Sequence, residues 1–136
     1  MNKPVSPERY KKVLVIDDDK IDMFISKRIL QSVFFAEEIV LKNSIVAAAD
    51  YLENSIRTSK NLPEIIFLDL NMPGEDSYDF IEQLTELKAV IGANFRVMIL
   101  ASETGEFKNK RATETDYSLV EAVFEKPLKP DVLTDI

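Results

Sequence analysis

Cysteine and histidine, two residue types that carry much of protein chemistry, do not occur in this sequence. Without cysteine the chain has no disulfide, thiolate nucleophile or cysteine metal site, so a reducing compartment is permitted. Without histidine it cannot form a Ser-His-Asp or Cys-His hydrolase site, a His-ligated zinc site or a phosphohistidine. Chemistry in this chain therefore depends on carboxylates, lysine, hydroxyl groups and a hard cation.

Long apolar runs and an excess of basic residues are absent too. No run reaches the roughly 20 residues of a membrane span, and the polar segment 1–12 lacks the apolar core of a signal peptide. We therefore expect a cytoplasmic protein with no membrane partner. The 17 basic and 24 acidic side chains give a net charge of −7. This charge disfavours direct nucleic acid binding, because phosphate binding depends on clustered Lys and Arg.

The length of 136 residues and the 46% share of hydrophobic residues suit a globular protein with a substantial core. We expect a single domain over residues 1–136, with an ordered core over about 12–134 and a polar N-terminal extension over 1–10. No internal repeat or linker interrupts the chain.

Short apolar runs bounded by polar or turn-forming residues predict the strands of a parallel sheet, buried on both faces. Four such runs occupy residues 13–16, 65–68, 97–101 and 120–124, and a weaker strand is expected near a sheet edge at 38–42. Helical segments separate the strands. This alternation predicts an α/β fold with a five-stranded parallel sheet that is doubly wound.

Helical spacing of apolar residues predicts helices over 20–34, 45–56 and 77–91, with Asp19 and Ser44 as N-caps of the first two. The expected buried face of the 77–91 helix consists of Phe80, Ile81, Leu84, Leu87, Val90 and Ile91. Gly92 or Asn94 can end that helix in the left-handed conformation. A short, weak helix is expected within 106–117, and a short or truncated last helix begins near Pro130.

Polar and ionisable residues follow the predicted strands at their carboxyl ends. They are Asp17-Asp18-Asp19, Asp69-Leu70-Asn71, Ala101-Ser102 and Lys126-Pro127. Right-handed crossovers bring these ends to one edge of a parallel sheet. Clustered carboxylates repel one another unless a cation is bound, and oxygen ligands suit Mg²⁺. Lys126 could pair with Asp69 or hold a phosphoryl oxygen.

An aspartate between Mg²⁺ and lysine can act as a nucleophile and form an acyl phosphate, because phosphoryl transfer mainly needs positioning and charge neutralisation. A purely structural interpretation is an acidic rim held by one lysine salt bridge. The arrival of all these groups at the ends of the predicted strands favours the chemical interpretation.

These motifs resemble the receiver domain of two-component response regulators. The resemblance covers about residues 12–133 and depends on the acidic run 17–19, the motif Asp69-Leu70-Asn71-Met72-Pro73-Gly74, and Lys126-Pro127. It implies a flavodoxin-like receiver fold. It also implies that Asp69 accepts a phosphoryl group from a phosphohistidine, on a sensor histidine kinase or a His-phosphotransfer protein. The domain would signal to an output partner and catalyse only its own phosphorylation and dephosphorylation.

The resemblance further implies roles for the residues around Asp69. Asp18, Asp69 and the carbonyl group of Asn71 would bind Mg²⁺ directly, with Asp17 acting through water. Lys126 would contact the phosphoryl group. The Lys126–Pro127 peptide bond would be cis.

Three positions depart from the family pattern. Ala101 stands where the fourth strand of a receiver usually ends in Thr or Ser, and Ser102 follows it as a possible hydroxyl contact to the phosphoryl group. Val123 replaces the usual aromatic residue of the fifth strand, and Ser77 stands where Gly is usual. Either Ala101 or Ser102 occupies the position of the Thr/Ser switch residue.

Two other functions remain as alternatives at this point. Asp17-Asp18-Asp19 offers the D-x-D spacing of a Mg²⁺-dependent phosphohydrolase with an aspartyl nucleophile, although the chain shows neither the following Thr or Val nor a substrate-binding insertion. A degenerate receiver that acts only as an interaction module is disfavoured, because every residue of the acceptor motif is present.

Overall fold

The computed structural model describes residues 8–102, 118–134 and 136. The strands are β1 (Tyr10–Ile16), β2 (Ala36–Lys42), β3 (Ile65–Asp69), β4 (Arg96–Ala101) and β5 (Val120–Glu125). The helices are α1 (Lys20–Ser32), α2 (Ile45–Arg57), α3 (Ser77–Ile91) and the short 3-10 helix η1 (Pro130–Leu133). The five predicted strands are confirmed. The weak helix predicted within 106–117 lies outside the described residues.

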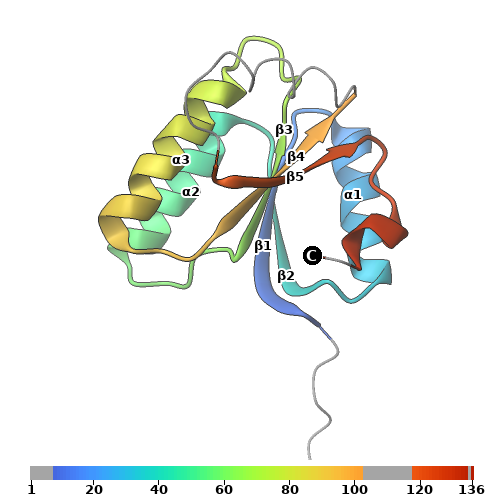
Figure 1. Cartoon of the computed structure of the whole chain (residues 1–136), viewed down its shortest axis with the longest axis horizontal. Coiled ribbons are helices and arrows are strands. Elements are labelled where there is room, and N and C mark those ends of the chain that lie inside the picture. The colour runs from blue at the N-terminus through green and yellow to red at the C-terminus, as the bar shows by residue number, and fades with distance from the viewer. Residues whose placement is uncertain (1–7, 103–117, 135) are drawn as a thin grey trace, which may run out of the picture.

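The five strands form one parallel sheet in the order β2-β1-β3-β4-β5. As Figure 1 shows, α1 and η1 cover one face of the sheet, and α2 and α3 cover the other. β2 is an edge strand, as predicted, and β3 lies at the centre. The predicted doubly wound α/β fold is confirmed. Among the described residues, no helix combines the length and the apolar character needed to cross a membrane.

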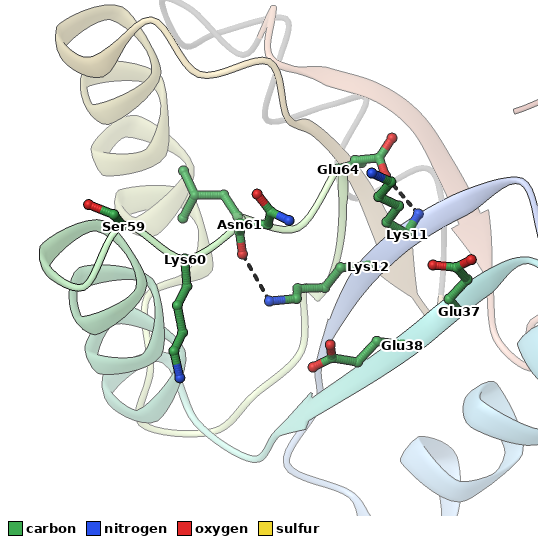
Figure 2. A pocket seen from close by; sticks show the side chains of 9 residues that line it. Lys11, Lys12, Glu37, Glu38, Ser59, Lys60, Asn61 and Glu64 are labelled. Carbon is green, nitrogen blue, oxygen red and sulfur yellow. Dashed lines mark hydrogen bonds between the residues drawn. The ribbon is translucent and has the colours of Figure 1, made fainter.

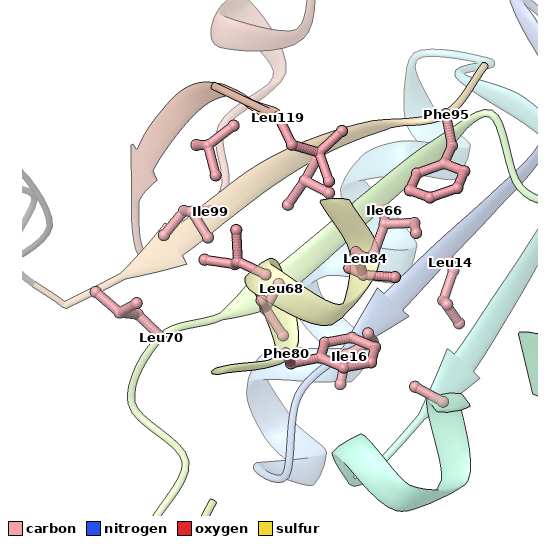
Figure 3. Close-up of a cluster of buried hydrophobic side chains, with 14 of the residues drawn as sticks. Leu14, Ile16, Ile66, Leu68, Leu70, Phe80, Leu84, Phe95, Ile99 and Leu119 are labelled. Carbon is pink, nitrogen blue, oxygen red and sulfur yellow. The ribbon is translucent and has the colours of Figure 1, made fainter. Parts of the chain in front are cut away.

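Two hydrophobic clusters hold the helices to the sheet. Because side chains alternate along a strand, Leu14 and Ile16 of β1 face α2 and α3, whereas Val13 and Val15 face α1. Figure 3 shows the first cluster, in which the Phe80 and Leu84 side chains of α3 pack on the sheet. All five residues of β3 are buried. This two-sided burial explains why the strands appear in the sequence as continuous apolar runs.

The helix ends follow the predicted capping chemistry. Asp19 caps α1 by accepting hydrogen bonds from the backbone N–H groups of Ile21 and Asp22, and Ser44 caps α2. Gly92 ends α3 with a φ of 66°, in the left-handed region. The α1 cap matters for the site, because it fixes the first turn of that helix beside the end of β1.

The prediction that Val90 lies on the buried face of α3 is wrong, because its side chain is 82% exposed. Val90 follows Leu84 by six residues, which turns it about 240° around the helix axis and away from the sheet. The prediction for Ile91 is wrong too, because its side chain, at the end of the helix, is 38% exposed. The α3 residues that are fully buried are Phe80, Ile81 and Leu84, together with Ser77.

Candidate functional site

A cavity of about 360 Å³ lies at the carboxyl edge of the sheet. Its lining residues are Asp18, Asp19, Asp22, Asp69, Asn71, Pro73, Ser102 and Lys126. They come from the last residue of β3, from the segments that follow β1, β3, β4 and β5, and from the first turn of α1. The structure therefore brings together the residues that the sequence placed at the strand ends. Asp17, the remaining predicted site residue, is fully buried.

Asp17 and Asp69 are held in the same way. Oδ1 of Asp69 accepts the backbone N–H of Asn71 at 3.0 Å, and Oδ1 of Asp17 accepts the backbone N–H of Asp19 at 3.0 Å. Such bonds to the backbone two residues further on are a common use of aspartate where a strand turns into a loop. The second oxygen of each carboxylate, Oδ2, remains for contacts with other side chains.

Lys126 connects the carboxylates. Its Nζ lies 3.1 Å from Oδ2 of Asp17, 3.0 Å from Oδ2 of Asp69 and 3.1 Å from Oδ2 of Asp22. Its backbone N–H donates to the carbonyl oxygen of Ala101 at 2.8 Å, which fixes the end of β5 beside β4. The cis peptide bond expected between Lys126 and Pro127 is present.

The ionisation of this cluster reflects competition between burial and pairing. Burial lowers the pKa of Lys126, but the contacts with Asp69 and Asp17 more than offset it and raise that pKa above its ordinary value. Burial raises the pKa of Asp17 from 3.8 to about 6. This pKa is the net result of burial and a smaller increase from the charge of Asp69, both opposed by the N–H of Asp19 and the ammonium group of Lys126. Lys126 is thus cationic, and Asp17 carries a charge that its surroundings only partly stabilise.

The donor set fits a hard divalent cation. Asp17, Asp18 and Asp69 each offer a carboxylate oxygen, and these oxygens lie within 4.8 Å of one another. Oδ2 of Asp17 is buried and, although 3.1 Å from Nζ of Lys126, makes no well-directed hydrogen bond to any described residue. Carboxylate and carbonyl oxygens are the ligands that Mg²⁺ prefers. A cation here would relieve the repulsion among the three carboxylates.

The structure distinguishes the surroundings of Ala101 and Ser102. Ala101 is fully buried in the cluster beneath α2 and α3, and the partly buried Val123 packs against the same cluster. Ser102 is exposed and lines the cavity. Its backbone N–H donates to Oδ1 of Asn71 at 3.4 Å. Ser102 is therefore the residue of this pair that carries a hydroxyl group on the cavity wall.

Sequence reasoning did not identify the contacts that two residues, Ser77 and Asp22, make in the site. The hydroxyl group of Ser77, buried at the start of α3, donates to the backbone carbonyl of Asp69 at 2.8 Å. Ser77 is helical, and the left-handed residue of the preceding loop is Gly74, with a φ of 78°. Asp22, the other omission, was detectable, since it lies in the first turn of a helix that begins beside the acidic run.

A larger cavity, of about 990 Å³, lies at the opposite edge of the sheet (Figure 2). Its ionic lining balances three lysines against three glutamates: Lys11, Lys12, Lys60, Glu37, Glu38 and Glu64. Lys12 is engaged with the carbonyl oxygen of Asn61 at 2.9 Å. Within the described part of the chain, the carboxylates that could share a cation are Asp17, Asp18 and Asp69. Asp18 and Asp69 line the smaller cavity, which makes that cavity the candidate site.

Comparisons with known proteins show which family this chain resembles. The chain matches the sequence profile of the response regulator receiver domain over residues 13–136. It is 28% identical over 125 residues to the hybrid signal transduction histidine kinase L of Dictyostelium discoideum, a match that covers 92% of this chain and 7% of that protein. A crystal structure of a two-component response regulator from Cytophaga hutchinsonii has a TM-score of 0.78 and 28% identity, with 92% of both chains covered.

A more distant structure shares the fold. The receiver domain of the Arabidopsis thaliana histidine kinase CKI1, complexed with Mg²⁺ and BeF₃⁻, has a TM-score of 0.62 at 20% identity and covers 80% of this chain and 82% of its own. The profile match includes every strand end that contributes to the cavity. The chain belongs to the family of response regulator receiver domains.

Proposed function

We propose that this chain is a phosphoacceptor in a two-component phosphorelay and that Asp69 takes a phosphoryl group from the phosphohistidine of a sensor histidine kinase or a His-phosphotransfer protein. The observation that carries the proposal is the environment of Asp69. This carboxylate ends the central strand, lies 3.0 Å from the ammonium group of Lys126 and shares its cavity with the carboxylate of Asp18.

In the proposed transfer, a carboxylate oxygen of Asp69 forms a bond to phosphorus while the bond from phosphorus to the donor imidazole breaks. The electron pair of the broken bond returns to the imidazole nitrogen, and no oxidation or reduction occurs. Lys126 holds a phosphoryl oxygen and balances its charge. Asp17, Asp18, Asp69 and Asn71 would hold Mg²⁺, which supplies further charge neutralisation when it is bound.

The proposal extends to the place of the domain in signalling. The domain would act in the cytoplasm, catalyse only its own phosphorylation and dephosphorylation, and pass the signal to an output partner. The acidic character of the chain, with its net charge of −7, supports a protein output partner rather than direct nucleic acid binding. The Asp-lined cavity and the membership of the receiver family support this assignment over hydrolysis of a separate substrate.

Intact-mass measurement tests this function. Incubation with acetyl phosphate and Mg²⁺ is expected to add about 80 Da, the mass of one phosphoryl group, and chelation of the metal should prevent the gain. Asp69→Asn should abolish labelling. The matched control is Asp50→Asn, which changes an exposed aspartate of α2 and should label normally. Undiminished labelling of Asp69→Asn would show that the acceptor is another residue.

A further inference from the structure

Asp22 contacts the lysine of the site, although it belongs to none of the motifs that mark the family resemblance. Its Oδ2 lies 3.1 Å from Nζ of Lys126, 104 positions away in the sequence. The start of α1 fixes this geometry, because the backbone N–H of Asp22 donates to the capping carboxylate of Asp19 at 3.0 Å. Asp22 is therefore placed by the helix cap rather than by a flexible loop.

Three carboxylates surround the ammonium group of Lys126, and one of them, Asp22, accepts a hydrogen bond from it at 3.1 Å. A lysine ammonium group has three N–H donors, and the carboxylates of Asp17, Asp22 and Asp69 each lie at 3.0–3.1 Å from its nitrogen. A phosphoryl group on Asp69 would need at least one of these donors. The phosphoryl group would then compete with the three carboxylates for these donors.

Asp22 is the partner that the lysine can release most easily. The side chains of Asp17 and Asp69 are 0% and 1% exposed, whereas that of Asp22 is 37% exposed, so water can take over its hydrogen bond. The group of carboxylates that could share a cation consists of Asp17, Asp18 and Asp69 and does not include Asp22. A bound cation would therefore balance the charges of Asp17 and Asp69 without replacing the contact of Asp22.

We propose that Asp22 is a positioning residue, which holds one N–H donor of Lys126 in the unphosphorylated protein and competes for it with the phosphoryl group on Asp69. The inference rests on the proposed function and deepens it. Asp22 would disfavour the phosphorylated state and limit its population. Loss of a partly exposed ion pair corresponds to roughly a two- to five-fold change in an equilibrium constant.

Beryllofluoride, a noncovalent stand-in for the phosphoryl group, gives an equilibrium test. We expect Asp22→Asn and Asp22→Ala to bind beryllofluoride with saturating Mg²⁺ roughly two- to five-fold more tightly than the unsubstituted chain. Amide chemical shifts report the titration, and circular dichroism checks that each variant is folded. Equal or weaker binding by both folded variants would overturn the inference, while labelling of the unsubstituted chain at Asp69 would leave the proposed function standing.

A matched variant separates release of Lys126 from the simple loss of a negative charge. Asp19 lines the same cavity but forms no ion pair with Lys126 among those of the described residues. Serine at position 19 can still cap α1, so Asp19→Ser removes a nearby charge and keeps the helix start. We expect less gain in affinity from Asp19→Ser than from Asp22→Asn. An equal gain would assign the effect to general repulsion of anions and overturn the inference.

The affinity for Mg²⁺, measured without beryllofluoride, distinguishes a partner of Lys126 from a metal ligand or a structural residue. Because Asp22 lies outside the group of carboxylates that could share a cation, we expect Asp22→Asn to leave Mg²⁺ affinity unchanged within about two-fold, a margin far smaller than loss of a charged ligand would produce. A merely structural defect would weaken both ligands together. A marked loss of Mg²⁺ affinity would identify Asp22 as a metal ligand and overturn its assignment as a partner of Lys126.

Discussion

Replacement of Asp17 by asparagine is expected to favour the folded, metal-free protein increasingly as the pH rises from about 4 to neutral. Burial, with a smaller contribution from the charge of Asp69, raises the pKa of Asp17 from 3.8 to about 6, despite the opposing effects of the Asp19 N–H and Lys126. The folded state therefore favours the protonated carboxyl group. The resulting stability is fully present below about pH 3.8 and is lost as the pH rises through about 6.

The size of this effect follows from the two pKa values. They differ by about 2 units, each equivalent to about 1.4 kcal/mol, which gives about 3 kcal/mol in the free energy of unfolding. The asparagine side chain of the variant does not titrate. Most of this difference falls between about pH 4 and pH 7.5, so over that range the stability of Asp17→Asn relative to the unsubstituted chain should rise by roughly 2.5 kcal/mol. Any pH-independent cost of the substitution cancels in this comparison.

Urea unfolding followed by circular dichroism, with EDTA present across this pH range, measures the difference. Asp50→Asn, which changes an exposed aspartate, is the control and should show a nearly constant difference. A difference for Asp17→Asn that stays constant or falls as the pH rises would refute the reasoning. It would mean that Lys126 compensates the charge of Asp17 fully and that the site carries no excess of negative charge for a cation to relieve.

Three further substitutions test separate parts of the structure. Phe34 is exposed at the end of α1 and has a left-handed φ of 52°, a conformation that is strained for residues other than glycine. Phe34→Gly should therefore raise the free energy of unfolding by about 1 kcal/mol in urea unfolding. A lower free energy of unfolding would show that Phe34 is not strained. The buried hydroxyl group of Tyr51 has no hydrogen-bond partner among the described residues. Tyr51→Phe should therefore raise the free energy of unfolding by about 1 kcal/mol in the same assay. A lower value would show that the hydroxyl group makes a stabilising hydrogen bond. Because Ser102 is on the cavity wall, Ser102→Ala should weaken beryllofluoride binding roughly 2- to 10-fold in a chemical-shift titration; unchanged affinity would exclude its hydroxyl as a contact.

The sheet and much of the site could be predicted because the strands of a parallel sheet have a recognisable sequence pattern. A strand buried on both faces, such as β3, is a continuous apolar run, and the polar residue that follows it lies at the ligand-binding edge. The edge strand β2 begins at Ala36, earlier than predicted, since its exposed Glu37 and Glu38 interrupt the apolar pattern. At a sheet edge, backbone pairing can form a strand from polar residues, so the apolar pattern does not show where that strand begins.

The features that escaped prediction depend on contacts between distant segments. Asp22 meets Lys126 only because α1 begins beside β1 while β5 ends at the same sheet edge, and local sequence does not specify the distance between them. The placement of Ser102 on the cavity wall likewise depends on where β4 ends relative to Asn71. Helical geometry alone places Val90 on the outer face of α3. The prediction was wrong because it treated an apolar side chain as buried.

Chemical trapping of the acyl phosphate tests the central claim most directly. Borohydride reduces an aspartyl phosphate to homoserine, which marks the acceptor permanently and can be located by peptide mass spectrometry. After treatment with acetyl phosphate and Mg²⁺, we expect homoserine at residue 69 and no conversion in samples that lacked the phosphodonor or contained EDTA. Homoserine at another aspartate, or a phosphorylated chain with none at residue 69, would contradict the assignment of Asp69 as the phosphoacceptor.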